Sequence, residues 1–289
     1  MQPLLTVIIP HRNDLLRLRR LLSSIELQSH DLGDIEVVVV DDRSSIDQKP
    51  HRLQDNYAFL ECLESKGQNA GDARNLGLSY AKGQWIVFAD SDDYFVNFSQ
   101  LLTSAKNLSN DVDLVYFDVS SEHDGTSNMS SRHLKYSMLL YEFIQNPKLD
   151  NIRYQHSVPW GKLVKCNLIK GKGLEFDSLL ASNDICFSLK AGVFARRIDY
   201  IESVHYVVTE SEGTLTSSLN ARKSRARLKA TLNYNKFLID NGCSEKWILV
   251  APRLIVNEII PPYSKDSLWL VIRAIYYFFR RFLVSLFNR

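Results

Sequence analysis

Acidic and polar residues follow three apolar segments of the sequence, at the points where those segments end. Residues 11–13 (His-Arg-Asn) follow the first segment, Asp41 and Asp42 follow the second, and the run 90–93 (Asp-Ser-Asp-Asp) follows the fourth. Ligands of an open parallel sheet bind at the carboxyl ends of its strands, so these side chains are expected at one edge. Packed carboxylates repel one another unless a positive group joins them, and their oxygens suit Mg²⁺ or Mn²⁺. The pattern therefore indicates a divalent-cation site.

Such a cation has few protein ligands, which points to a phosphate-bearing ligand. A metal held by one or two carboxylates completes its coordination with water and substrate phosphates, so a diphosphate is expected. The sequence has no GxxxxGK[ST] and no GxGxxG, which disfavours P-loop enzymes and dinucleotide oxidoreductases. Tyr94 and Phe95 stand where an EF-hand needs an oxygen ligand and a glycine. The competing interpretation is that these acids only cap helices or lie solvated in loops.

An α/β sheet is the expected scaffold for these residues. Five short apolar segments predict strands: 4–9, 35–40, 59–63, 85–89 and 112–119. Four consecutive valines at 37–40 predict a strand covered on both faces, as in a parallel sheet under helices. Helices are predicted between and after the strands: one capped by Asn13 or Asp14, then 69–82, 99–108, 133–146, 185–194 and 221–241. This alternation indicates βαβ units and an open sheet.

The composition excludes several classes of protein. The chain has 289 residues, 35 Lys plus Arg against 33 Asp plus Glu, 45% hydrophobic and 24% charged residues. These values exclude wholesale disorder, collagen and a disulfide mini-scaffold, and the net charge of +2 argues against nucleic acid as a partner. The four cysteines form no CxxC pair, and residues 1–12 lack the features of a secretory signal. A reducing, cytoplasmic location is therefore expected.

Four blocks of the sequence together resemble glycosyltransferase family 2, whose members have the GT-A fold. They are residues 5–13 (LTVIIPHRN), 37–42 (VVVVDD), 69–75 (NAGDARN) and 88–93 (FADSDD), in the family's order. The resemblance covers roughly the first 120 residues. It implies a Rossmann-like, mostly parallel open sheet flanked by helices, followed by a C-terminal helical extension. The expected division is a donor-binding half at 1–120, an acceptor-binding half at 121–212, a basic helical extension at 213–262 and an amphipathic helix at 263–289.

The resemblance also implies a nucleotide-sugar donor, usually a UDP-sugar, and assigns roles to residues of the four blocks. Pro10, Arg12 and Asp41 would line the pocket of the base. Asp90 would contact the ribose, and Asp92 would coordinate the Mn²⁺ or Mg²⁺ that bridges the diphosphate. The implied donor-binding set is completed by other residues of the same blocks: Asn13, Asp42, Gly71, Arg74 and Ser91.

Two residues of the third block have specific expected roles. Gly71 has no Cβ, so the backbone can come close to the donor there. Arg74 would help to shape the donor pocket. The alternative for Arg74 is a salt bridge to an acid of the sheet edge, and either role keeps it near the site.

The acceptor half carries the expected catalytic base. Family members commonly use the Asp of a Glu-Asp pair ahead of a helix, and the similar stretch here places Asn183 and Asp184 in those positions. Asp184 is the predicted base, and the alternative is that it only caps the following helix. Trp160 is a weaker candidate, with Asn183, for acceptor binding, although an aromatic residue here is as often part of the core. The segment from His205 lacks the basic residue that the family usually carries.

The implied reaction is a single displacement that inverts the anomeric centre. Asp184 would take the proton of the acceptor hydroxyl, and the cation at Asp92 would neutralise charge on the departing diphosphate. No QxxRW sequence occurs, which favours addition of single sugars over processive polymerisation. A glycan or lipid-linked acceptor in bacterial capsule, O-antigen or lipooligosaccharide synthesis is the expected setting. The alternatives are a sugar nucleotidyltransferase and a catalytically inactive membrane-associated scaffold.

The C-terminal tail is aromatic and basic. At 100° per residue its polar side collects five residues, Arg273, Tyr277, Arg280, Arg281 and Asn288, and the rest is apolar. Arginines within the run argue against a spanning helix, which needs about 20 mostly uncharged residues. An interfacial helix on the anionic inner face of the cell membrane is expected. The alternative is a helix docked on the domain or on a second subunit, which leaves homo-oligomerisation open.

Overall fold

The computed structural model of the chain describes residues 2–28, 32–126, 128–211, 221–249, 269–270, 272–277 and 279–280. The chain forms two compact units. The first comprises Met1–Ser178 and Phe187–Glu212, and the second comprises Leu179–Cys186 and Gly213–Arg289. The short segment Leu179–Cys186, which falls within the range 121–212 expected for the acceptor-binding half, groups with the second unit.

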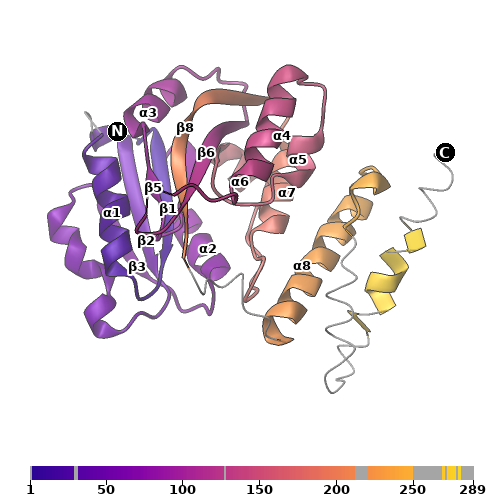
Figure 1. Cartoon of the computed structure of the whole chain (residues 1–289), viewed down its shortest axis with the longest axis horizontal. Coiled ribbons are helices and arrows are strands. Elements are labelled where there is room, and N and C mark those ends of the chain that lie inside the picture. Colours follow the sequence, from indigo (N-terminus) through magenta and orange to yellow (C-terminus); the bar gives the residue numbers. More distant parts are fainter. Residues whose placement is uncertain are drawn as a thin grey trace. The chain divides into compact units, whose positions relative to one another are not determined.

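The first unit is built on an eight-stranded sheet with the order β3-β2-β1-β4-β7-β6-β8-β5 (Figure 1). The strands are β1 Leu5–His11, β2 Ile35–Asp41, β3 Leu60–Glu64, β4 Trp85–Phe88, β5 Tyr94–Phe95, β6 Leu114–His123, β7 Lys162–Lys165 and β8 Ile198–Glu210. β1, β2, β3 and β4 are mutually parallel, as are β6 and β8. The predicted α/β class with a mostly parallel sheet is thereby confirmed.

The order of the parallel strands creates a topological switch point. The chain runs outward from β1 through β2 to β3, then returns to place β4 on the other side of β1. Ligands of open α/β sheets bind at such a point, outside the carboxyl ends of the strands. β7 lies antiparallel to both β4 and β6, so β6 runs in the same direction as β4. The ends of β1, β2, β4 and β6 therefore meet at one edge.

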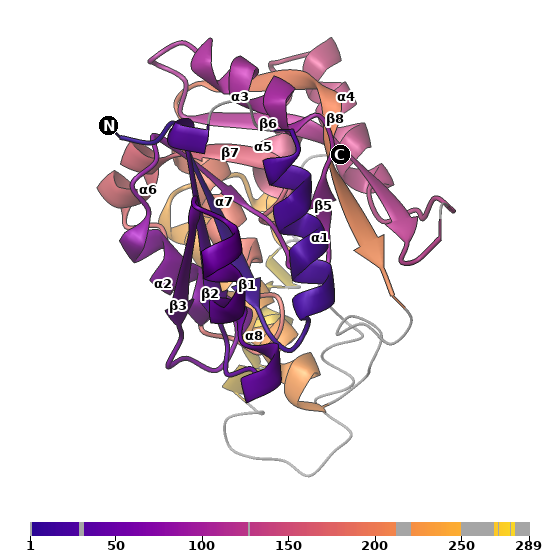
Figure 2. The same ribbon diagram turned by 90° about the vertical axis from the view of Figure 1, so that its left-hand side faces the viewer.

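Helices cover both faces of this sheet. They are α1 Leu15–Glu26, α2 Ala70–Tyr80, α3 Phe98–Lys106, α4 Leu134–Gln145, α5 Asn151–Gln155, α6 Cys166–Lys172 and α7 Ile185–Phe194. Figure 1 shows α1 and α3 on one side of the sheet and α2 with α4 on the other, and Figure 2 views the side that carries α1. Short 3₁₀ helices follow β1 and β2 along the chain at Leu32–Asp34, Ile46–Gln48 and Pro50–Asn56.

Alternating side chains of the strands explain the two covered faces. Val37 and Val39 of β2 join the core that includes α1, whereas Val38 and Val40 pack with Ala73 of α2. Successive residues of a strand point to opposite faces, so a run of valines is buried on both. β1 begins one residue later and ends two residues later than the predicted segment 4–9, at His11. Asp14, not Asn13, caps α1, because its side chain accepts the backbone N–H of Arg17.

Beyond Leu179–Cys186, most of the described part of the second unit is helical. α8 (Ala221–Asp240) is followed by a 3₁₀ helix at Glu245–Trp247, and residues 269–270, 272–277 and 279–280 are helical. Of the predicted segments 213–262 and 263–289, residues 213–220, 250–268, 271, 278 and 281–289 lie outside the described residues. Among the helices that the structure describes, none has the length and apolarity needed to cross a bilayer.

Candidate active site

The carboxyl ends of β1 and β2 lie side by side, because His11 pairs with Asp41 in the parallel register. Asp41 is buried, with 1% of its surface exposed, and accepts the Ser44 backbone N–H at 3.3 and 3.2 Å. Burial lowers the pKa of His11, although its hydrogen bond to the Gln48 carbonyl and the charge of Asp41 oppose the change. Backbone hydrogen bonding thus fixes the Asp41 carboxylate at the sheet edge.

Asn13 ties the loops after these two strands together. Its φ of 53° lies in the left-handed region, which asparagine tolerates better than most residues. Its backbone N–H donates to Ser44 Oγ at 2.8 Å, and its Oδ1 accepts the Ser45 N–H at 2.7 Å. Asn13 therefore holds the loop after β1 against the loop after β2, where the donor pocket is predicted.

Asp42 lies beside two guanidinium groups. Its Oδ2 is 3.9 Å from Arg12 Nη1, and its Oδ1 is 3.3 Å from Arg43 Nε. The Arg12 side chain is 56% exposed, whereas that of Asp42 is 8% exposed. Arg12 is therefore at the surface of the predicted base pocket, and Pro10 is buried within β1.

The third block forms the start of α2. Asn69 caps the helix, since its Oδ1 accepts the N–H groups of Gly71 at 2.9 Å and Asp72 at 3.1 Å. Its Nδ2 donates to Asp72 Oδ2 at 2.7 Å. Gly71 is buried in this first turn. The cap sets the position from which Arg74, one turn later, reaches the sheet edge.

Arg74 joins the third block to the fourth. Its Nη2 lies 2.6 Å from Asp90 Oδ1, and its guanidinium carbon lies 5.3 Å from the centre of the Phe176 ring. The Arg74 side chain is 7% exposed and that of Asp90 is 28% exposed. The ion pair with a sheet-edge acid is thus the arrangement that the structure shows. It neutralises Asp90 and holds it beside the rest of the acidic loop.

Breaking this ion pair is expected to destabilise the fold. Replacing Arg74 with alanine leaves Asp90 without its partner in a partly buried position, and losing one partner of a buried pair costs about 3–5 kcal/mol. Because Asp90 is partly exposed, we expect a loss of about 2–3 kcal/mol in the free energy of unfolding. Denaturant titration measures it. The matched control is Arg197→Ala, which breaks an exposed pair with Asp111 of the same 2.6 Å length and should cost less than about 1 kcal/mol. Equal losses would contradict the assigned burial effect.

Asp93, the last acid of the fourth block, is an internal anchor. It is 2% exposed, and its carboxylate accepts the Tyr206 hydroxyl at 2.8 Å and the Thr209 backbone N–H at 2.7 Å. Burial, and then the charges of Asp92 and Asp90, raise its pKa. The Tyr206 hydroxyl also accepts the backbone N–H of Asp90 at 2.8 Å. Tyr206 and Thr209 therefore fix both ends of the acidic loop, a role that the sequence did not indicate.

Asp92 is the acid of this loop that remains available. It is half-buried, as is the neighbouring Ser91, and no described side chain forms an ion pair with it. Burial, and then the nearby charge of Asp90, raise the pKa of Asp92 to about 6. A carboxylate whose negative charge is disfavoured by burial and by a neighbouring carboxylate binds a proton or a cation more readily than a solvated carboxylate does.

The side chains available to a metal suit a cation that takes its other ligands from a bound small molecule and water. In the described part of the chain, no three His, Cys, Asp or Glu side chains come together as a metal cage. Asp90 is engaged by Arg74 and Asp93 by Tyr206, which leaves one hard carboxylate at Asp92. Mg²⁺ and Mn²⁺ accept such an arrangement, completing their shell with water and phosphate oxygens.

The predicted base lies in the second unit. Asp184 is half-buried and immediately precedes α7. Asn183 is 7% exposed, and its Nδ2 donates to the Leu179 carbonyl at 3.1 Å. Asn183 is therefore tied to its own segment through its amide nitrogen, and its place in acceptor binding stays a prediction.

Trp160 is wrong as a predicted sugar platform. Its side chain is 1% exposed and packs edge-on against Tyr136, with ring centres 4.9 Å apart. No ring face is left for a sugar, so Trp160 belongs to the core, the alternative given above. His205 is also fully buried, and its Nδ1 lies 3.1 Å from the Asn97 carbonyl. Neither residue lines the site.

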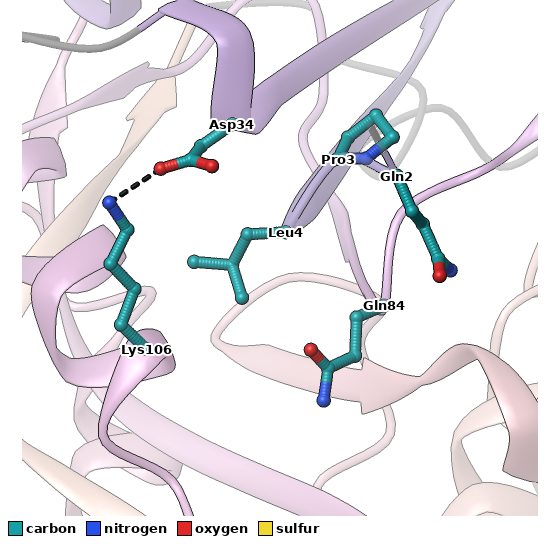
Figure 3. A pocket seen from close by; sticks show the side chains of 6 residues that line it. All are labelled: Gln2, Pro3, Leu4, Asp34, Gln84 and Lys106. Atoms are coloured by element: carbon teal, nitrogen blue, oxygen red, sulfur yellow. Dashed lines mark ion pairs between the residues drawn. The ribbon is translucent and has the colours of Figure 1, made fainter.

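Two hollows indent the surface of the first unit. One is lined by residues that precede the parallel strands, with Lys106 paired to Asp34 at 2.5 Å (Figure 3). It therefore lies at the edge opposite the carboxylates. The other lies at the carboxyl end of β3 beside α2, where Ser65 and Asp72 contribute to its lining. Ser65 donates its N–H to the Asp41 carbonyl at 2.8 Å, which places this second hollow at the predicted donor edge.

Comparisons with known proteins agree with this geometry. The family model described as Glycosyl transferase family 2 matches residues 6–168, a range that includes the acidic loop and ends before Asp184. The chain is 29% identical over 223 residues to poly(ribitol-phosphate) β-N-acetylglucosaminyltransferase TarS of Staphylococcus aureus strain MW2. That alignment covers 74% of this chain and 37% of TarS, so the chain spans little more than a third of this relative.

Solved structures show the same fold. The crystal structure of S. aureus TarS 1–349 with UDP-GlcNAc superposes with a TM-score of 0.64 and 20% identity, covering 96% of this chain and 72% of the other. The mannosyltransferase PcManGT of Pyrobaculum calidifontis, solved with GDP-Man and Mn²⁺, gives a TM-score of 0.57 and 18% identity. It covers 96% of this chain and 74% of its own.

Proposed function

The chain belongs to glycosyl transferase family 2, and from that premise we propose that it moves a sugar from a UDP-sugar to a hydroxyl of a glycan or lipid-linked acceptor. The observation that carries the proposal is the acidic loop at the switch point of the sheet. There Asp90 is neutralised by Arg74 and Asp93 is buried, whereas the Asp92 carboxylate has no ion-pair partner among the described side chains. One carboxylate without an ion-pair partner, beside two that are engaged, suits a diphosphate that binds together with a cation.

We assign the donor to the edge formed by β1, β2 and the start of α2. Pro10, Arg12 and Asp41 would surround the base, and the buried Asp41 carboxylate offers a fixed acceptor for the N–H of uracil. The proposal is supported by the likeness to TarS, whose structure contains UDP-GlcNAc. Gly71 and Asn13 would shape the same pocket through the backbone, which both already organise by hydrogen bonds.

Asp92 would hold Mn²⁺ or Mg²⁺ against the diphosphate. When bound, such a cation supplies Lewis-acid neutralisation of the negative charge that grows on the leaving nucleoside diphosphate. Arg74 orients the Asp90 carboxylate in the acidic loop through the 2.6 Å ion pair. The hydrogen bonds to Asp93 and to the Asp90 backbone keep the loop from shifting when charge develops nearby.

Asp184 would act as the general base. It would accept the proton of the acceptor hydroxyl as that oxygen attacks the anomeric carbon from the side opposite the diphosphate. A single displacement inverts the configuration at that carbon. The position of Asp184 immediately before the first residue of α7 also suits a carboxylate, because the helix N-terminus favours negative charge.

We also propose that the C-terminal helical segment lies on a membrane surface. Trp269, Ile272, Tyr276 and Phe279 recur at helical spacing and are between 55% and 65% exposed. On the other side, Tyr277 is 5% exposed, and Arg280 forms a 2.6 Å ion pair with Glu245. The apolar face is therefore turned outward and the arginine inward, which supports insertion by apolar burial.

Vesicle sedimentation tests this membrane proposal. The chain with Trp269→Ser and Phe279→Ser should bind phosphatidylglycerol-containing vesicles about tenfold or more weakly than the wild type, because two large apolar side chains are lost. The control is Lys236→Ser on the exposed side of α8. Equal binding by all three proteins, or a concentration-dependent dimer that the double variant loses, would favour the second-subunit alternative.

Release of UDP tests the function itself. The purified chain is incubated with a panel of UDP-sugars and with Mn²⁺, Mg²⁺ or EDTA, and transfer products are identified by mass spectrometry. We expect UDP release from at least one donor, lowered about 100-fold or more by EDTA. Release that persists unchanged in EDTA and in Asp92→Asn would overturn the cation assignment. Formation of UTP from a UDP-sugar and pyrophosphate would instead identify a nucleotidyltransferase.

A further inference from the structure

An ionic cluster on the helix side of the acidic loop has no part in the function proposed so far. Arg20 of α1 donates from Nη2 to the backbone carbonyl of Asp92, a contact shorter than an ordinary hydrogen bond. Its Nη1 lies 2.9 Å from Asp124 Oδ1, and its guanidinium carbon lies 5.2 Å from the centre of the Tyr94 ring. One side chain thus joins the loop that carries Asp92 to the turn after β6.

Asp124 is held in turn by a second arginine. Arg17, one turn earlier on α1, donates from Nε to Asp124 Oδ2 at 2.7 Å and from Nη1 to Asp14 Oδ2 at 2.7 Å. Burial opposes ionisation of Asp124, but the hydrogen bonds from Arg20 and Arg17 keep its pKa below the ordinary value. The backbone N–H of Asp124 also donates to the Glu210 carbonyl at 3.0 Å. The turn after β6 is therefore locked to both α1 and the end of β8.

The Asp92 carbonyl has a second donor from β8. The Thr209 hydroxyl donates to it, and Thr209 Oγ1 is also within 3.5 Å of Arg20 Nη2. Two donors on one carbonyl fix the orientation of the peptide, and with it the direction in which the Asp92 side chain leaves the backbone. Of the two donors, Arg20 is the one that is itself held in place by Asp124.

We propose that Arg20 and Asp124 form a clamp that positions Asp92 for the cation–diphosphate unit, so that both are positioning residues for the reaction. The clamp rests on the proposed function, because it assumes that Asp92 holds the cation. The clamp predicts a defect in cation-dependent donor binding beyond any loss of stability. A merely structural ion pair would lower the melting temperature and leave that binding unchanged.

Calorimetric titration of Mn²⁺–UDP into the full chain tests the clamp without depending on turnover. Arg20→Ala and Asp124→Asn should each raise the dissociation constant about tenfold. The double variant should be no weaker than Arg20→Ala, because residues in one network are not additive. Arg20→Lys should recover part of the affinity, since a lysine keeps the charge and loses the second donor. The matched control is Arg19→Ala on the same helix, which removes an exposed arginine and should bind as the wild type does.

The outcomes separate the clamp from the function. Wild-type binding together with clamp variants that match Arg19→Ala overturns the clamp alone, whatever their melting temperatures. If Arg20→Ala does not fold, Asp124→Asn and Arg20→Lys carry the comparison. Binding of Mn²⁺–UDP without any sugar transfer, together with weaker binding by the clamp variants, would refute the transferase proposal and support the clamp. A wild-type chain that binds no Mn²⁺–UDP overturns both.

Discussion

Replacing Asp184 with asparagine is expected to lower turnover for sugar transfer by about 100- to 10,000-fold, the range that a positioned general base contributes. The amide removes the basic oxygen and keeps the size of the side chain. KM for the donor should change little, because the residues proposed to bind the donor lie in the first unit and are untouched. Steady-state kinetics with saturating Mn²⁺ measures both values.

Asparagine also separates catalysis from helix capping. Asp184 immediately precedes α7, so the competing role is that of a cap. Asparagine and aspartate cap helices about equally well, so a residue that only caps would leave turnover unchanged in Asp184→Asn. Asp150 precedes α5 in the same way, and Asp150→Asn is the matched control that should retain full activity. Loss of activity in both variants would point to a general effect of removing negative charge.

The parallel half of the fold was predictable because local physics specifies it. The valines of β2 require cover on both faces, and the strand is buried along its whole length. The α2 and α3 segments begin and end within about two residues of the predicted bounds. Asn69 illustrates why: a capping side chain marks a helix start in the sequence and satisfies the same N–H groups in the structure.

The rest of the site could not be predicted because it depends on contacts between distant segments. The partners of Asp93, Tyr206 and Thr209, are more than 110 residues away along the chain, and no short motif announces the pairing. The antiparallel strand β7 has four residues, too few to show a period. Trp160 shows the same limit, since the sequence alone does not distinguish a core aromatic from an exposed one.

Contacts with residues far away along the chain determine which aspartates of the run 90–93 have carboxylates engaged by other described side chains. Apart from the roles that the family resemblance implies, nothing in the sequence of this run distinguishes the three aspartates, which are all carboxylates that follow a strand. In the structure, one is paired with Arg74, one is buried under Tyr206, and Asp92 remains. The different surroundings of the three aspartates therefore set which of them is available to a ligand.

Replacing Asp92 with asparagine is expected to abolish most activity and yet to stabilise the protein in the absence of a cation. Turnover should fall about 100- to 1,000-fold, the cost of removing one preorganised electrostatic stabiliser. The melting temperature at pH 7.5 in EDTA should rise by about 2–6 °C, because the variant no longer carries a charge that burial and Asp90 disfavour. Differential scanning calorimetry and UDP-release kinetics measure the two effects.

The sign of the pH dependence follows from the direction of the shift. The pKa of Asp92 is about 6 in the folded state and near 3.8 in the unfolded chain, so the folded state holds the extra proton between these values. Stability without a cation therefore falls as pH rises from about 4 to 6, and the advantage of Asp92→Asn should vanish below pH 4. Asp111→Asn is the control: hydrogen bonds from Ser109 and Arg197 lower the pKa of Asp111, so its loss should give no stabilisation.

The same carboxylate links stability to function through competition between a proton and a cation. Below pH 6 the apparent affinity for Mn²⁺ in the presence of UDP should fall about tenfold per pH unit, because the ligand must be deprotonated to bind. Mn²⁺ with UDP should raise the melting temperature of the wild type and have little effect on Asp92→Asn. An Asp92→Asn protein that melts below the wild type in EDTA would show that the Asp92 carboxylate is not destabilised by its surroundings. A variant that Mn²⁺–UDP still stabilises as much as the wild type would show that Asp92 is not the cation's ligand.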